Sequence, residues 1–158
     1  MTSLISIREN YLSDPDAVFA NACSFERLRG AMRGLATYHG LPERGDMIEG
    51  QTYRTDIWFW RLLPVRNHII KVERLSIADR LIQTSESHAG VSTWTHQVKV
   101  DQLNDHAIWV DQIRIKAGSQ TPFVARFARY VYLRRHHAQG ATTTESSLTA
   151  QRSQAPSG

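Results

Sequence analysis

Several residue types that would mark particular classes of protein are scarce in this sequence. Its single cysteine, Cys23, excludes an internal disulfide and a cluster of thiolate metal ligands. No apolar run approaches the roughly 20 residues that span a bilayer, so no integral membrane segment is expected. The first residues lack a basic start followed by a long apolar stretch, which predicts no secretory signal. We therefore predict a cytoplasmic protein with no bound metal and no cofactor.

The excess of one charge is also small. The 19 lysines and arginines stand against 15 acidic residues, which gives a net charge of +4. The two signs are mostly interspersed, whereas a nucleic-acid-binding protein usually concentrates positive charge on one face. Basic residues in the last turn of a helix complement its dipole, so we predict no nucleic-acid partner. Basic residues gather only in the last predicted helix, at Arg126, Arg129, Arg134, Arg135, His136 and His137.

The sequence does have enough apolar side chains for one core. The chain of 158 residues is 41% apolar and 22% charged, which suits one globular domain. We place the folded domain at residues 1–139. The remainder, 140–158, has almost no apolar content and is predicted to be a flexible polar tail.

The N-terminal part is predicted to form one strand and two short helices. Ser3 to Asn10 alternates as a strand does. The run Ser13-Asp14-Pro15-Asp16 opens a helix, because a polar cap, an early proline and first-turn acids are typical of helix starts. Ser24 caps a second short helix, which Gly30 and Gly34 weaken and end.

A period of two then predicts a run of antiparallel strands before one long helix. Leu35 to Asp46 is predicted to be a loop. Pro64 breaks the first long strand, and Arg66-Asn67 suits a turn. Thr121-Pro122 opens the final helix, with a threonine cap and proline at the first position. The predicted strands are Met47 to Leu62, His68 to Ile77, Leu81 to His88, Ser92 to Gln102 and His106 to Ala117, and the final helix runs from Thr121 to about Ala138.

This order predicts an α+β fold in which a curved antiparallel sheet of six to seven strands wraps the long C-terminal helix. A meander of this length must bury one face, and the final helix is the only large apolar element available to cover it. A strongly twisted sheet around one helix leaves a gap, and such gaps commonly hold a ligand. We therefore expect an internal apolar cavity.

The hairpin around Leu103-Asn104 is the most informative stretch. With these two residues as the loop, antiparallel pairing sets His96 opposite Asp111. One face is then apolar apart from this pair, and a slip by one residue would mix the two faces. The inner face therefore carries Trp94 and Trp109 beside a polar island of His96 and Asp111.

The Ala89-Gly90 turn extends this face onto the preceding strand. Pairing across the turn places Gln83 beside His96, which adds Gln83 to the polar island. Glu73, one strand further, is expected to point the same way. The other histidines near predicted turns have no partners at metal-ligand spacing, namely His39, His68, His88 and His106.

The pair of His96 and Asp111 allows two interpretations. One is structural, because the hydrogen bond fixes the imidazole tautomer and satisfies buried groups. The other is a recognition or acid–base site at the cavity floor. We favour the structural interpretation, since buried ionisable pairs are often structural and no nucleophile is placed with this one.

These features resemble the START-like, Bet v 1-like superfamily, also called SRPBCC proteins, over about Ser3 to Ala138. In these relatives a glycine turn leads into a Trp-x-His strand, and a strand with a mid-strand acid follows. The resemblance is closest to bacterial single-domain members related to polyketide cyclases. It implies the helix-grip fold, but the superfamily includes carriers, cyclases and quinone-binding proteins. The motifs that carry it are Ser13-Asp14-Pro15 with Val18-Phe19, Val72-Glu73, Gly90 to His96, Trp109-Val110-Asp111, and Phe127 with Tyr130 to Arg135.

Three adjacent aromatic residues, Trp58, Phe59 and Trp60, cannot all lie on one face of a strand. Phe59 shares a face with Tyr53 and Ile57, so Trp58 and Trp60 are predicted to point the other way. Exposed aromatic patches often mark contacts, so this edge is a candidate interface, most simply for a homodimer. The alternative is that loops or the helical hairpin cover it.

Three hypotheses about function follow. The first is non-catalytic binding of a small hydrophobic or aromatic molecule, such as a lipid, a polyketide or an isoprenoid-like compound. The second is a polyketide cyclase or dehydratase in which His96 is the general base and Asp111 orients it. The third is a protein-interaction module that uses the Trp58/Trp60 edge. The ligand-binding residues predicted for the first hypothesis are Tyr53, Ile57, Glu73, Gln83, Trp94, His96, Trp109, Asp111, Phe127 and Tyr130.

Overall fold

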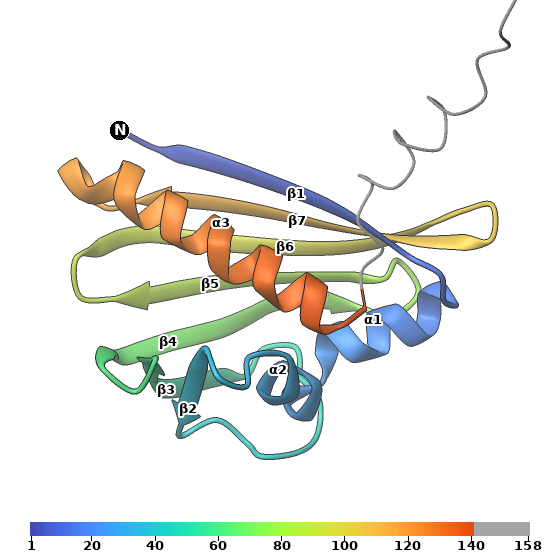
Figure 1. Cartoon of the computed structure of the whole chain (residues 1–158), viewed down its shortest axis with the longest axis horizontal. Helices are drawn as coiled ribbons and strands as arrows, with labels where there is room; N and C mark the ends of the chain where they lie inside the picture. The colour runs from blue at the N-terminus through green and yellow to red at the C-terminus, as the bar shows by residue number, and fades with distance from the viewer. Residues whose placement is uncertain (141–158) are drawn as a thin grey trace, which may run out of the picture.

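The computed structural model describes residues 1–140, and the predicted polar tail lies, from Ala141 onward, outside the described residues. One strand is followed by two short helices, six further strands and a long helix (Figure 1). No helix in residues 1–140 is long and apolar enough to cross a membrane. The elements are β1 (Ser3–Tyr11), α1 (Pro15–Cys23), α2 (Phe25–Ala31), β2 (Ala36–His39), β3 (Thr52–Phe59), β4 (Leu63–Ser76), β5 (Leu81–His88), β6 (Val91–Leu103), β7 (His106–Lys116), a short 3-10 helix (Gly118–Gln120) and α3 (Thr121–Ala138).

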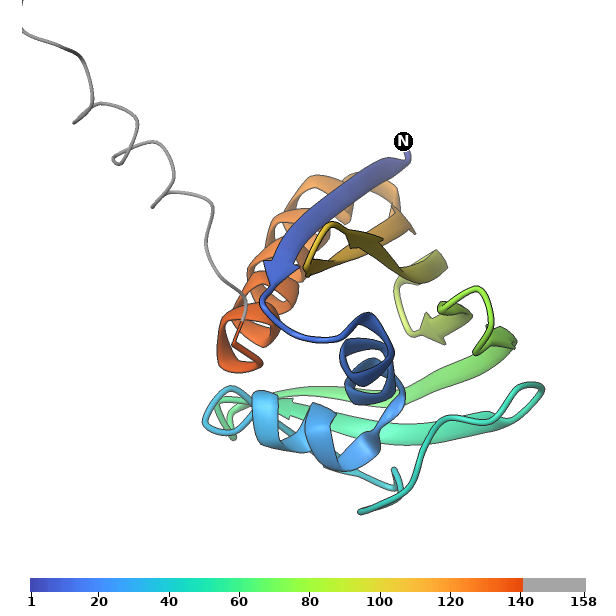
Figure 2. The ribbon, with the colours of Figure 1, turned by 90° about the vertical axis from the view of Figure 1, so that its right-hand side faces the viewer.

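The seven strands of this part of the chain form one antiparallel sheet in the order β1-β7-β6-β5-β4-β3-β2. The sheet curls, and α3 lies along its concave face beside β1 and β7 (Figure 2). α1 packs against β6 and β7, and α2 packs against α3. The predicted α+β architecture, with a curved sheet around the C-terminal helix and two short helices after the first strand, is confirmed.

The helix starts follow from local side-chain chemistry. The Asp14 side chain accepts a hydrogen bond from the Ala17 N–H at 3.0 Å, with Pro15 in the first turn, so the predicted cap of α1 is confirmed. Ser24 caps α2 in the same way. Thr121 was predicted to cap α3 but is its first helical residue. Its hydroxyl instead accepts from the backbone N–H of Ala117 at 2.9 Å.

Two predicted loop boundaries are wrong. β2 lies within 35–46, which was predicted to be a loop, and pairs with β3. The chain reverses at Trp60 and Arg61, both of which have positive φ, rather than at Arg66-Asn67. Pro64 does not break a strand, because it lies at the start of β4, where a missing N–H donor is tolerated.

The β6–β7 hairpin turns at Asn104-Asp105, one residue later than predicted. Asn104 has a φ of 57°, a left-handed conformation that asparagine tolerates. The pairing is therefore shifted by two residues, and His96 lies opposite Ile113 rather than Asp111. Because side chains alternate with a period of two, this shift leaves every residue on its predicted face.

The β5–β6 hairpin differs in a way that does change the face. A β-bulge between Glu86 and His88 shifts the register by one residue, so Thr84 rather than Gln83 lies opposite His96. The inner face of β5 therefore carries Thr84 and Glu86, and Gln83 lies on the outer face.

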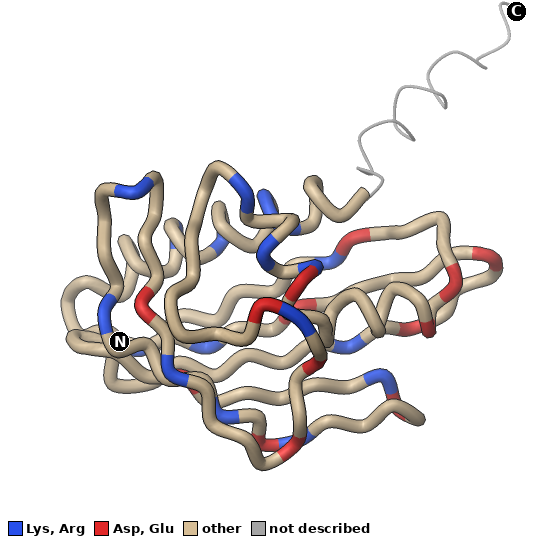
Figure 3. Tube along the Cα trace, turned by 90° about the horizontal axis from the view of Figure 1, so that it is seen from below, with Lys and Arg blue, Asp and Glu red and all other residues tan. Residues whose placement is uncertain are grey.

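Three clusters of buried apolar side chains form where α1, α2 and α3 meet the sheet. Full burial of one aliphatic or phenyl side chain contributes about 1.5–3 kcal/mol. Charged residues of both signs are scattered along the trace (Figure 3). The largest fully buried apolar side chains are Trp109, Phe25, Met32, Ile113 and Ile115.

Candidate functional site

A cavity of about 330 Å³ lies between α3 and the concave face of the sheet. Small-molecule sites typically measure about 300–1,000 Å³. The wall along α3 is a stripe at four-residue spacing, formed by Phe123, Phe127, Val131 and Arg135. The sheet side is mostly apolar and includes Ile57, Ile70, Ile82, Trp94 and Val98.

A series of hydrogen-bonded polar side chains runs from the protein interior to the wall of the cavity. Both Asp111 oxygens are engaged, Oδ1 by His96 Nε2 at 2.6 Å and Oδ2 by His136 Nε2 at 2.5 Å. The Tyr11 hydroxyl reaches His136 Nδ1 at 2.6 Å, and the Tyr132 hydroxyl reaches His96 Nδ1 at 3.3 Å. Of these residues, His96 and Tyr132 line the cavity.

The ionised Asp111 carboxylate fixes the direction of these hydrogen bonds. A carboxylate only accepts, so both His96 and His136 donate from Nε2. A neutral imidazole that donates from Nε2 keeps a lone pair at Nδ1, which accepts from a hydroxyl. In its neutral form His96 therefore presents an acceptor at Nδ1, next to the hydroxyl of Tyr132.

A second polar group lies on β4 and β5. Glu86 Oε2 accepts from His68 Nε2 at 2.8 Å, and Oε1 accepts from the Thr84 hydroxyl at 3.0 Å. His68 Nδ1 lies 3.2 Å from His88 Nδ1, so one of these two nitrogens donates to the other. Glu86 Oε1 is also 4.0 Å from His96 Nδ1. All five side chains line the cavity and give its apolar wall one continuous polar strip.

The surroundings of the site keep Asp111 and Glu86 ionised and Tyr132 protonated. Burial alone raises the pKa of Asp111, but hydrogen bonds from His136 and His96 outweigh it and hold that pKa well below its usual range. Burial likewise opposes ionisation of Glu86, yet the hydrogen bond from His68 lowers its pKa overall. Burial and then the charge of Glu86 raise the pKa of Tyr132 well above its usual range. The cavity wall therefore offers the fixed carboxylate acceptor of Glu86 in the strip and, from α3, the protonated hydroxyl of Tyr132 at neutral pH.

No family model and no curated protein sequence matches the chain, but solved structures do. Protein CV1439 from Chromobacterium violaceum superposes with a TM-score of 0.65 at 11% identity, covering 86% of this chain and 94% of that one. Truncated norcoclaurine synthase from Thalictrum flavum superposes with a TM-score of 0.65 at 12% identity, covering 87% of this chain and 91% of that one. A START superfamily protein from Mycobacterium smegmatis superposes with a TM-score of 0.61 at 10% identity, covering 86% of this chain and 93% of that one. The chain has the START/Bet v 1-like fold. At these identities the likeness shows the fold alone.

Four of the predicted ligand-binding residues line the cavity of this START/Bet v 1-like fold, namely Ile57, Trp94, His96 and Phe127. Asp111 lies behind the wall and reaches the cavity only through His96. Trp109 is 1% exposed and packs against Tyr11 and His136 with centroid distances of 5.9 and 4.8 Å. Tyr53 packs against Phe25, with ring centroids 4.9 Å apart.

The other three predicted residues lie away from the cavity. Gln83 is on the outer face, where its amide bonds to Gln97 at 2.9 Å. Glu73 sits at a bulge between β4 and β5 and pairs with Lys71 at 2.9 Å on the surface. Tyr130 is on the exposed side of α3. The one-residue bulges explain the first two placements, because each reverses the alternation of side chains.

Several polar wall residues were not predicted from the sequence. His68 and His88 were considered only as metal ligands and were given no role, yet they bond to each other and His68 bonds to Glu86. The spacing of Thr84, Glu86 and His88 at every second residue of one strand is a signal that could have found them. For the helix, the signal is the four-residue spacing that joins Arg135 to Val131 and Tyr132 to Ala128.

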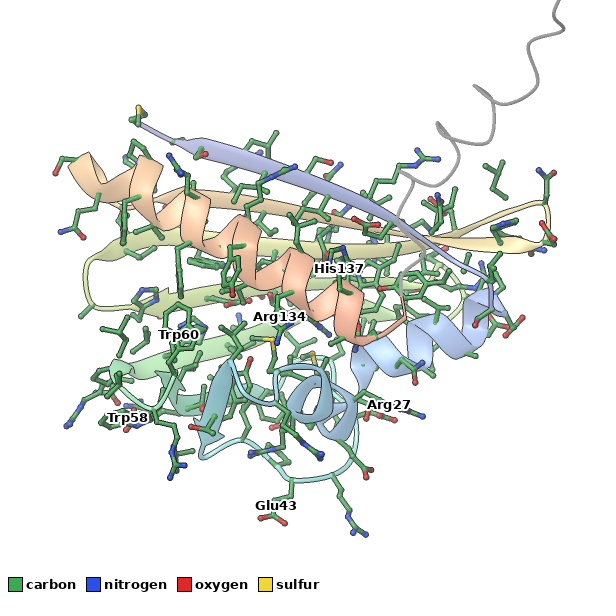
Figure 4. All side chains as sticks on the ribbon, viewed as in Figure 1. Arg27, Glu43, Trp58, Trp60, Arg134 and His137 are labelled. Carbon is green, nitrogen blue, oxygen red and sulfur yellow. The ribbon has the colours of Figure 1, made fainter. Side chains whose placement is uncertain are left out.

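The Trp58/Trp60 edge is not one patch. Trp60 lies in the β3–β4 turn, where alternation ends, and its ring packs against Phe127 and Tyr130 with centroid distances of 5.9 and 6.5 Å. Trp58 instead lies under the guanidinium of Arg66 at 5.9 Å. Trp60 accordingly lies nearer to α3 than Trp58 does (Figure 4). The prediction that both point away from Phe59 is wrong for Trp60, and a homodimer stays a prediction.

One end of the cavity opens beside the β3–β4 turn. Leu63 and Phe123 line the cavity and are also exposed, Phe123 to 75% of its surface. Trp60 and Leu62 in the same turn are exposed as well. We interpret this end, between the turn and the first turn of α3, as the mouth.

Proposed function

We propose that the chain binds a small, mostly apolar molecule in the cavity between α3 and the sheet. The observation that carries the proposal is an apolar space of about 330 Å³ with one polar strip in its wall. Apolar walls with a few fixed polar groups are typical of sites that bind and orient a small molecule. The solved structures of this fold include a START superfamily protein, in keeping with a ligand-binding role.

The test uses Nile red, an uncharged fluorescent probe, with Trp94 as the reporter. We expect probe binding to quench tryptophan emission, with the largest share of quenching lost in Trp94→Phe because this indole lines the cavity. The phenyl ring in Trp94→Phe is smaller than an indole but keeps most of the apolar contact, so the affinity for Nile red is expected to fall less than about tenfold. Trp58→Phe is the matched control on the outer face and is expected to leave the quenching unchanged. Equal quenching in the two variants would place the probe elsewhere.

The enzyme hypothesis keeps one specific observation in its favour. The Nδ1 atom of His96 faces the cavity beside the Tyr132 hydroxyl, while Nε2 is held by Asp111. This is the arrangement of an oriented general base with a neighbouring proton donor. We therefore propose, as the second candidate, proton abstraction from a carbon between two carbonyl groups of a polyketide-like substrate.

A linear synthetic poly-β-ketone tests this second candidate. If the chain accelerates its cyclisation, His96→Gln is expected to lower the rate by about 10²–10⁴-fold while Nile red still binds. Thr93→Ser, also on β6 but outside the wall, is the control. A rate that His96→Gln leaves unchanged would remove the enzyme hypothesis and leave binding intact.

A further inference from the structure

Arg135 is a buried cation without a counter-ion among the described residues. The residue is 7% exposed, and its side chain lines the cavity. Nη2 makes a long hydrogen bond of 3.4 Å to the carbonyl oxygen of Ala22, and the guanidinium lies over the Trp109 ring at 5.1 Å. Nε is buried and has no hydrogen-bond partner. No carboxylate in residues 1–140 forms an ion pair with this guanidinium.

The two buried acids of the interior, Asp111 and Glu86, form no ion pair with it. Asp111 is saturated by His96 and His136, and Glu86 is held by His68. An arginine stays protonated at any pH at which proteins fold, so it cannot escape the cost of burial by losing its charge. A buried charge without a partner is unfavourable, and an anion that pairs with it offsets part of that cost.

The position of Arg135 on α3 sets the shape of the molecule that fits. Phe123 at the mouth and Arg135 are twelve residues apart on one stripe, which at about 1.5 Å per residue is roughly 18 Å. Phe127 and Val131 line the cavity between them with apolar surface. An elongated apolar body with an anionic head group at its inner end matches this arrangement.

We propose that the ligand carries a carboxylate that pairs with Arg135 at the inner end of the cavity, with its apolar body directed to the mouth. This inference rests on the proposed binding function and names the chemical class of the ligand. A planar guanidinium and a carboxylate form paired, charge-assisted hydrogen bonds, and Arg135 has donors to spare. The negative charge of Glu86 on the sheet wall disfavours an anion there, so the cation selects the place of the head group.

The test compares parinaric acid with its methyl ester, which have the same apolar body and differ in charge. The full chain is expected to bind the acid about ten- to a hundredfold more tightly than the ester. Arg135→Met is expected to remove this preference by weakening the acid alone, and Arg135→Lys is expected to retain part of it. Arg134→Met removes the neighbouring exposed cation on the same helix turn (Figure 4) and is expected to change neither affinity.

The outcomes separate this inference from the proposed function. Equal affinity of the unmodified chain for acid and ester overturns the carboxylate and leaves apolar binding intact. Failure to bind either compound overturns the proposed function itself. Circular dichroism shows whether each variant is folded. Should Arg135→Met not fold, Arg135→Lys with Arg134→Met decides the location, because a preference lowered equally by both would place the carboxylate outside the cavity.

Discussion

Replacing Asp111 with alanine is expected to lower the free energy of unfolding by about 3–5 kcal/mol, as measured by urea denaturation. Asp111 is 1% exposed and accepts hydrogen bonds from both His96 and His136. Removing the carboxylate leaves two Nε2–H donors in the interior with no acceptor. The loss is large because the partners stay behind, and it does not measure the net value of the network.

Asp101→Ala is the matched control, since Asp101 is an exposed acid on the neighbouring strand β6. Its partner is Lys99 at 3.6 Å, and an exposed ion pair of this kind contributes at most about 1 kcal/mol. The loss in free energy of unfolding for Asp111→Asn is expected to lie between those of Asp111→Ala and Asp101→Ala. The amide keeps one acceptor oxygen but turns an N–H donor toward the other histidine. Similar losses for Asp111→Ala and Asp101→Ala would contradict the buried network.

The same carboxylate makes stability depend on pH in a defined direction. The pKa of Asp111 in the folded protein lies below its ordinary value of 3.8, because the hydrogen bonds from His136 and His96 outweigh the effect of burial. A group with a lowered pKa binds protons more readily in the unfolded chain, so its contribution is complete above about pH 5 and is lost as the pH falls toward 2. Urea midpoints are therefore expected to fall over this range, and less steeply in Asp111→Asn. The pKa of Glu86 is also lowered, so Glu86 acts in the same direction and contributes to the acid sensitivity that remains.

The sheet faces show what alternation alone can predict. His96 and Asp111 were predicted to be cross-strand partners, and they do meet, although each faces a different residue across the ladder. The turn was misplaced by one residue, which moves the pairing by two and keeps the faces. The prediction therefore identified the contact correctly while its register was wrong.

Bulges limit the same reasoning. The bulge next to Glu86 inserts one residue and exchanges the faces of β5, which brings Glu86 and Thr84 to the cavity in place of Gln83. Alternating sequence gives no sign of an inserted residue, because both faces of β5 contain polar side chains. A strand with one strictly apolar face would have revealed the error.

The C-terminal helix shows a second limit. Its bounds at Thr121 and Ala138 follow from the proline start and the glycine stop, and both were predicted. The burial of Arg135 was not predicted, because basic residues in the last turn of a helix are usually explained by the helix dipole. Burial here depends on how α3 meets α1 and the sheet, a tertiary feature that no local pattern contains.

Filling the cavity is expected to abolish binding without unfolding the protein. Val131 is half-buried at the middle of the α3 stripe and faces the cavity. In Val131→Trp, the indole occupies space that an apolar ligand needs, so Nile red affinity is expected to fall at least about a hundredfold, or about 2.7 kcal/mol. The free energy of unfolding is expected to stay the same or to rise by about 0.5–2 kcal/mol, as is common when a side chain fills an internal space.

Stability and binding must be measured together for this variant, because together they report whether the cavity exists in solution. If side chains pack that interior solid, the added indole overfills it, and the chain loses about 1–3 kcal/mol of stability instead. Arg129→Trp places the same residue on the exposed side of α3, where it is expected to change neither quantity. Lost binding with retained stability in Val131→Trp alone requires an internal space along α3, on which both the proposed function and the pairing of a carboxylate with Arg135 depend.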